Sequence, residues 1–253
     1  EAWAGGGASQ VDFESGRLFD LISGGFALYT SFPIYAPYQY GNSQLLLPDQ
    51  QGYAVVGQLY GQVHLDDATV FTAGRRVWET PYLNGHDNRM TPNTFYGYVL
   101  QSAIGTPEGG RPVARLGGGY IATMKPRDAV DFQSMAQAAG GRLDWQQVSI
   151  GAIDYFSQDT MNIAYGEGSF GFPLPLGLRA ILAMQYADQR STGANLLNNG
   201  ECWSTGQVGS RLQLGYETAI LTVGFSAVNP GYAMQSPWSS RSEEHTSELP
   251  VTV

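Results

Sequence analysis

The chain has 253 residues, a formal net charge of −9 and a pI of about 4.7. This acidic balance argues against a nucleic-acid-binding protein, and the 14% of charged residues is low for a soluble α/β enzyme, which usually carries about 25%. No apolar run approaches the roughly 18 residues that a transmembrane helix needs, so a soluble β-protein and a transmembrane β-barrel remain.

The two ends of the sequence differ from the chain between them. Glu1 follows no initiator methionine or signal-like stretch, so we expect the N-terminus to be a truncation. The last thirteen residues, RSEEHTSELPVTV, are polar, and their beginning resembles the conceptual translation of a sequencing-library adapter. We therefore expect one domain over residues 1–240 and a non-native tail over residues 241–253, with a natural acidic tail as the alternative.

The first clear strand pattern lies at residues 52–64. Residues 1–25 are glycine-rich and weakly patterned, so we expect mainly loop there, and residues 26–35 predict a strand that Pro33 bends or ends. After a loop at 36–51, alternate residues form an apolar set, Tyr53, Val55, Leu59 and Val63, and a polar set, Gln58, Tyr60, Gln62 and His64. This period of two predicts a strand with one apolar and one wet face.

A long loop follows the strand predicted at residues 69–77 and ends near Phe95. It contains Pro81, Pro92 and the pair Asn84-Gly85. Proline removes a hydrogen-bond donor from a strand, and asparagine and glycine accept turn dihedrals, so a tight hairpin is disfavoured. A loop of this length inside a compact β pattern is usually functional.

Alternation returns in the second half of the chain. It is clear at residues 113–125, 178–189, 207–217 and 218–228, weaker at 98–104, 147–155 and 160–170, and interrupted by an expected loop at 126–144. We expect about nine or ten strands in all. They run to roughly ten residues, longer than the globular average of about five or six and close to the 9–11 that cross a bilayer.

These features predict an all-β fold, an antiparallel transmembrane β-barrel. Short and long connections alternate, as they do in such barrels, and aromatic residues lie near strand ends, where an aromatic girdle would lie. The residues expected to face outwards in an apolar band are Leu116, Tyr120, Ala122, Leu182, Met184, Leu212, Leu214, Leu221 and Val223.

The long loop also resembles a known motif. The run Gly74-Arg75, Thr80-Pro81, Asn84, Asp87, Arg89-Met90 and Pro92-Asn93-Thr94-Phe95 resembles the third-loop signature of the OprD-like bacterial outer-membrane porins. The resemblance extends over residues 52–63, 73–105, 120–135, 153–168, 183–193 and 229–239. It implies a passive channel in the bacterial outer membrane, surrounded by lipid, with the third loop folded inwards to narrow the pore. It also implies small carboxylates or amino acids as solutes. A complete barrel of this porin type has roughly 16–18 strands, a size that leaves an aqueous pore, so the resemblance implies that the nine or ten strands expected here form an incomplete barrel.

The predicted solute path is built from charged and amide side chains. An arginine facing lipid costs roughly 2–4 kcal/mol at mid-bilayer, so arginines on wet faces should line the lumen or lie near a rim, where lipid headgroups are the alternative ligand. Of Arg75 and Arg76, one must point inwards; in the loop, pairing of Asp87 with Arg89 is the alternative to solute contact. The full set is Arg75, Arg76, Asn84, Asp87, Asn88, Arg89, Arg115, Lys125, Arg127, Arg179 and Arg211.

No catalytic constellation appears in the sequence. His64 and His86 are isolated, without HExxH or CxxC spacing for a metal, so we expect neither an enzyme nor a cofactor. The main alternative function is a secreted β-rich module that binds carbohydrate or another ligand. Such a sandwich would bury the apolar faces that a barrel turns outwards. The oligomeric state cannot be read from these residues.

Overall fold

The structure is a computed structural model in which residues 5–36, 46–47, 50–85, 91–106, 111–126, 133–134 and 137–238 are described. They form β1 (Gly5–Glu14), β2 (Ile22–Tyr35), β3 (Tyr53–His64), β4 (Thr69–Arg76), β5 (Thr94–Ile104), β6 (Val113–Lys125), β7 (Gln133–Ser134), β8 (Gln137–Trp145), β9 (Val148–Ser157), β10 (Met161–Pro173), β11 (Arg179–Ser191), β12 (Ser204–Tyr216) and β13 (Ala219–Val228). Two short 3-10 turns, Pro175–Gly177 and Leu196–Asn198, lie in connections. Within these residues no helix is long and apolar enough to cross a membrane.

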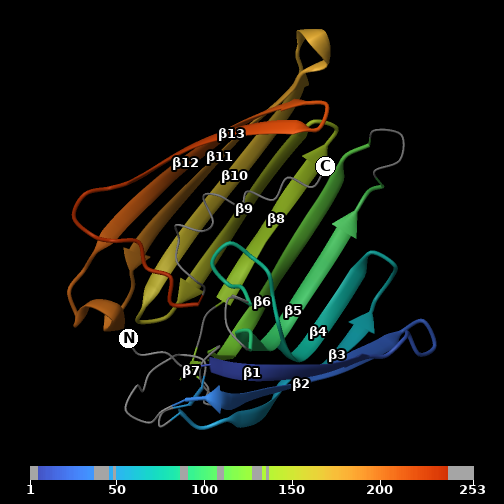
Figure 1. Cartoon of the computed structure of the whole chain (residues 1–253), viewed down its shortest axis with the longest axis vertical. Coiled ribbons are helices and arrows are strands. Elements are labelled where there is room, and N and C mark those ends of the chain that lie inside the picture. The colour runs from blue at the N-terminus through green and yellow to red at the C-terminus, as the bar shows by residue number, and fades with distance from the viewer. Residues whose placement is uncertain are drawn as a thin grey trace. The chain divides into compact units, whose positions relative to one another are not determined.

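The strands form an antiparallel sheet in which chain neighbours pair. The order is β1-β2-β3-β4-β5-β6-β8-β9-β10-β11-β12-β13, with β7 beside β6. The chain divides into two compact units, the first comprising Glu1–Leu100 and Gly119–Met135 and the second Gln101–Gly118 and Ala136–Val253. Figure 1 shows β1 to β4 side by side in the first unit and β8 to β13 side by side in the second. The predicted all-β antiparallel fold is confirmed.

One face of the second unit carries exposed apolar side chains. Phe170 pairs with Leu182, Leu182 with Leu212 and Leu212 with Val223, so these four side chains form one row across β10 to β13. They are 48%, 43%, 38% and 60% exposed. We call this side the apolar face. Its large side chains do not converge on a buried interior, as those of a β-sandwich would.

Aromatic residues lie at the two limits of this apolar face, measured along the strands. Tyr186 on β11 pairs with Val208 on β12, and Tyr216 ends β12; both tyrosines are about half exposed. The eight residue steps from 208 to 216 span about 27 Å of strand, or about 21 Å of membrane depth at a tilt of about 40°. This is close to the roughly 25 Å apolar band of outer-membrane barrels. Beyond Tyr186 the same face becomes charged, at Asp188 and Arg190.

Most of the residues expected to face outwards are exposed. Leu116, Tyr120, Leu182, Met184, Leu212, Leu221 and Val223 are all more than a third exposed, whereas Ala122 and Leu214 are half-buried. Alternation alone therefore identified the apolar face of the second unit.

The face predicted for the first part of β3 is wrong. The pairing of β3 with β2 shifts between Ala27 and Leu28, and Gly57 is the extra residue of the resulting β-bulge. A bulge exchanges the two faces of the strand beyond it, because side chains alternate strictly. Tyr53 is consequently buried on the side that carries the later polar residues, whereas Leu59 is 64% exposed on the other.

The expected number of strands was too low. Residues 1–25 were predicted as loop but contain β1 and the start of β2, and residues 126–144 were predicted as loop but contain most of β8. Both missed strands are rich in glycine and alanine, so they give little contrast between apolar and polar positions. Their backbones nevertheless pair in continuous register, β1 with β2 and β8 with β9.

Candidate functional site

The polar face of the second unit carries one row of residues in register. Arg142 on β8 pairs with Gly151, Gly151 with Glu167, Glu167 with Gln185 and Gln185 with Gly209. A Cβ at Gly151 would lie 3.3 Å from Glu167 Cγ and Oε1, and one at Gly209 would lie 3.0 Å from Gln185 Cγ. Because the glycines leave this space, long polar side chains can lie along the sheet and reach across a strand.

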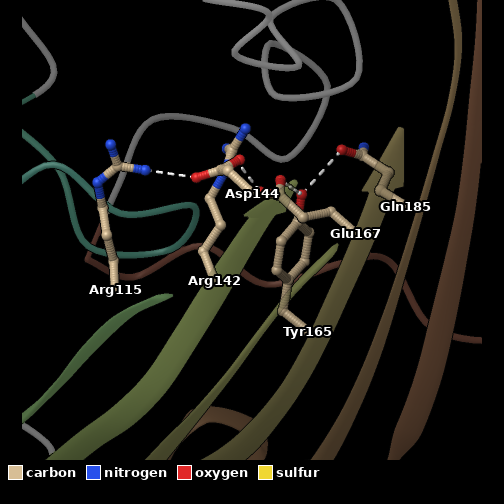
Figure 2. Close-up of polar contacts among 6 residues, drawn as sticks. All are labelled: Arg115, Arg142, Asp144, Tyr165, Glu167 and Gln185. Atoms are coloured by element: carbon tan, nitrogen blue, oxygen red, sulfur yellow. Dashed lines mark hydrogen bonds and ion pairs between the residues drawn. The ribbon is translucent and has the colours of Figure 1, made fainter. Parts of the chain in front are cut away.

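Arginines and carboxylates alternate in this row (Figure 2). Arg115 on β6 donates to Asp144 Oδ2; Arg142 donates through Nε to Asp144 Oδ1 at 2.8 Å and through Nη1 to Glu167 Oε1 at 3.2 Å. The side chain of Arg115 is 59% exposed, and that of Glu167 is 16% exposed. The ion pairs therefore run from a solvent-exposed cation to a largely buried carboxylate.

A tyrosine and a glutamine extend the row across β10 and β11 (Figure 2). The Tyr165 hydroxyl lies 2.9 Å from Glu167 Oε2 and 3.1 Å from Gln185 Oε1, and Tyr165 and Gln185 are both buried. A hydroxyl has one proton and donates to one acceptor at a time, and the charged carboxylate is the stronger acceptor. We call Arg115, Arg142, Asp144, Tyr165, Glu167 and Gln185 the charge row.

The charge row is electrically balanced. Its two guanidinium groups face two carboxylates, so Arg115 does not act as an isolated positive charge. Each exposed ion pair contributes only about 0–1 kcal/mol to stability, so its larger effect is on the electric field along the polar face. The sequence predicted Arg115 but not the carboxylates that compensate it.

The structure separates the two neighbouring arginines of β4. Arg75 pairs in register with the exposed Leu59, and its Nη1 donates to the carbonyl of Val56 at 2.7 Å. The Arg76 guanidinium carbon lies 4.8 Å from the centroid of the buried Tyr60 ring. Arg76 is thus the member of the pair on the polar face, and Arg75 lies on the apolar side.

The described parts of the long loop are buried in the first unit. Tyr82, Leu83, Asn84, Thr91 and Asn93 are each at most 6% exposed. Their backbones are joined by hydrogen bonds between Thr80 and Leu83 and from Asn93 N to Gly85 O at 2.6 Å. Burial also raises the pKa of Tyr82, so its phenol stays neutral.

Two strand residues anchor this loop. The Tyr53 and Thr91 hydroxyls lie 2.9 Å apart, and Lys125 Nζ donates to Thr91 Oγ1 at 3.3 Å and to the carbonyl of Pro126 at 2.8 Å. Lys125 and Thr91 are both 0% exposed. The structure therefore places Lys125 against the loop, where it supports Thr91.

The remaining predicted residues are scattered. Arg211 is buried on the polar face of β12, in register with Ala183, and Arg179 is exposed at the start of β11. Asp87, Asn88, Arg89 and Arg127 lie outside the described residues, as do His86 and the tail 241–253. In the described part of the chain, no group of three or more histidine, cysteine, aspartate or glutamate side chains could hold a metal ion.

Solved porin structures share this fold. A BenF-like porin from Pseudomonas fluorescens Pf-5 aligns with a TM-score of 0.76 at 15% identity, over 89% of this chain and 60% of that one. OpdK of Pseudomonas aeruginosa with vanillate gives 0.72 at 15%, over 88% and 61%. OccK2 (OpdF) of the same organism, in complex with glucuronate, gives 0.69 at 15%, over 89% and 58%.

These matches concern the fold. The chain spans 60%, 61% and 58% of the lengths of these three structures, in that order. No protein-family model matches the chain, and no curated protein matches it. The antiparallel sheet with an exposed apolar face is the arrangement that the alternating strands predicted. The chain therefore has the fold of the OprD-like outer-membrane porins.

Proposed function

We propose that this chain is part of a channel in the bacterial outer membrane through which small solutes diffuse down their gradients, without chemistry or a cofactor. The observation that carries the proposal is the division of one sheet into two faces. One face exposes an apolar row from Phe170 to Val223, suited to lipid, and the other carries the charge row. Only a closed barrel lets such strands satisfy their backbone groups in a bilayer.

The solutes proposed are small carboxylates or amino acids. The polar face offers both guanidinium and carboxylate groups to such molecules. The solved structures of similar fold include one with vanillate and one in complex with glucuronate, and both of these ligands are carboxylates.

The long loop is proposed to narrow this channel. Its described residues are held on the polar side by Tyr53 and Lys125, through Thr91. We further propose that Arg76 on β4 and Arg89 in the loop form the positive side of the constriction, with Arg115, Arg179 and Arg211 along the path. Asn84, Asp87, Asn88 and Arg127 complete the proposed path.

Planar-bilayer recordings test the proposed function. The full-length protein should give discrete conductance steps, and deletion of residues 85–90 should enlarge them, because less of the chain would then obstruct the pore. Thr91→Val keeps the loop length but removes the Thr91 contacts with both Tyr53 and Lys125, so it tests the anchoring of the loop separately from its length. Absence of any conductance step from correctly inserted protein would contradict the channel, and unchanged steps after the deletion would contradict the constriction.

A further inference from the structure

Four residues of the first unit form a row that alternates large and small side chains. Glu14 pairs with Gly25, Gly25 with Tyr60, and Tyr60 with Gly74, across β1 to β4. A Cβ at Gly25 would lie 2.8 Å from the Tyr60 hydroxyl oxygen and 2.9 Å from Cζ of the same ring. The ring therefore lies across β2 over Gly25, and its hydroxyl donates to Glu14 Oε1 at 2.7 Å.

The second glycine of this row shapes the end of β4. Gly74 has a φ of +120°, and a Cβ there would lie 2.4 Å from the carbonyl oxygen of Leu59, so a larger residue would not fit. Two residues later, the Arg76 guanidinium carbon lies 4.8 Å from the centroid of the Tyr60 ring and 5.7 Å from that of the Trp78 ring. The glycine thus allows the backbone path that brings Arg76 to the two aromatic rings.

Aromatic rings hold a guanidinium without cancelling its charge. A cation–π contact uses the faces of the rings and leaves the N–H groups at the edge of the guanidinium available. Arg115 and Arg142 are instead neutralised by carboxylates. Among the described residues, Arg76 forms no ion pair. Within the first unit it is therefore a fixed positive charge that no described ion pair neutralises.

A negative charge lies at the hydroxyl end of the same ring. Glu14 is exposed, and its Oε1 accepts the hydrogen bond from Tyr60. The Tyr60 ring thus separates a guanidinium over its face from a carboxylate at its hydroxyl edge. A simple carboxylate would be attracted by Arg76 but repelled by Glu14, whereas a molecule that carries both charges would be attracted by both residues.

We propose that Arg76, Tyr60 and Glu14 form a binding site for zwitterionic amino acids. The amino-acid carboxylate would accept two hydrogen bonds from the edge of Arg76, and its ammonium group would lie against the free oxygen of Glu14. This inference rests on the proposed channel and selects one of its two solute classes.

Swelling of liposomes that contain the full-length protein tests this assignment with two probes of similar size, L-alanine and propionate. Glu14→Gln should slow swelling in L-alanine by about fivefold, equivalent to about 1 kcal/mol, and should not slow swelling in propionate. Arg76→Gln should slow swelling in both probes. Arg190→Gln is the matched control, because it removes a guanidinium that is paired with Asp188 on the apolar face. Arabinose, which is uncharged, reports pore size and the amount of inserted protein.

The outcomes separate this site from the channel itself. If Glu14→Gln leaves the L-alanine rate unchanged, or slows L-alanine and propionate equally relative to arabinose, the zwitterion site is refuted. If Arg76→Gln affects propionate alone, the site does not bind amino acids and the assignment also fails. No swelling of wild-type liposomes in arabinose would instead refute the proposed channel, whatever the variants do.

Discussion

Arginine in place of Val223 should lower the free energy of unfolding from a lipid bilayer by about 2–4 kcal/mol. Val223 is 60% exposed and lies at the end of the apolar row that begins at Phe170. Near the bilayer midplane its replacement would place a guanidinium in hydrocarbon, where no water compensates the lost hydration. Urea titration of the full-length protein in lipid vesicles measures this difference.

The adjacent residue supplies the control. Thr222 pairs with Gln213 on the polar face and is also exposed, so Thr222→Arg adds the same charge to the same strand on its other side. We expect a change within about 0.5 kcal/mol for this variant. Equal destabilisation by the two arginines would mean that β13 does not separate lipid from water, and the assignment of the two faces would then be wrong.

Glu167→Gln should raise the permeability of the channel to anions relative to cations by about fivefold. The substitution keeps the shape of the side chain but removes one of the two carboxylates of the charge row, leaving a net charge of +1. One unit charge at about 8 Å, with an effective dielectric constant of about 80, is worth about 0.5 kcal/mol, favourable to an anion and unfavourable to a cation, so the ratio changes by about 1 kcal/mol, or about fivefold. The reversal potential under a potassium chloride gradient measures it.

Asp154→Asn is the matched change for this prediction. This substitution also removes one negative charge, but Asp154 lies on the apolar side of β9. Asp154 is exposed there, and its Oδ1 accepts a hydrogen bond from Asn162 Nδ2 at 2.9 Å. Its substitution should leave the reversal potential unchanged, since it does not face the proposed path. Equal shifts in the two variants would indicate that only the total charge of the protein matters. No shift in either would place the charge row outside the path.

Alternation was sufficient to predict the apolar faces of most long strands. In β11 to β13, runs of alternate positions carry large apolar side chains, and Leu182, Leu212 and Val223 lie where the pattern placed them. The pattern failed where side chains are small. Gly57 has no side chain, so the sequence does not show that the two faces of β3 exchange at the bulge. The alanines and glycines of β8 likewise could not be told from a loop sequence.

The charge row could not be predicted from single strands. Arg142 and Glu167 are 25 residues apart and meet because two registers, β8 with β9 and β9 with β10, align them across Gly151. A shift of either register by one residue would turn one of them to the other face. Sequence shows which residues share a face within a strand, but not which positions lie opposite each other in neighbouring strands. The same holds for Glu14 and Tyr60.

The central claim, that one face of this sheet meets lipid and the other meets water, can be measured with spin labels. Cys202 is the single cysteine of this sequence, so once it and any cysteine outside this sequence are replaced by serine, one label at a time can be placed at residues 221 to 226 of β13 in the reconstituted full-length protein. Labels at Leu221, Val223 and Phe225 should collide mainly with oxygen, which is concentrated in hydrocarbon, and labels at Thr222, Gly224 and Ser226 mainly with a water-soluble nickel chelate. A two-residue alternation between the two relaxation agents is the predicted result. Equal access of the nickel chelate to all six positions would contradict the account.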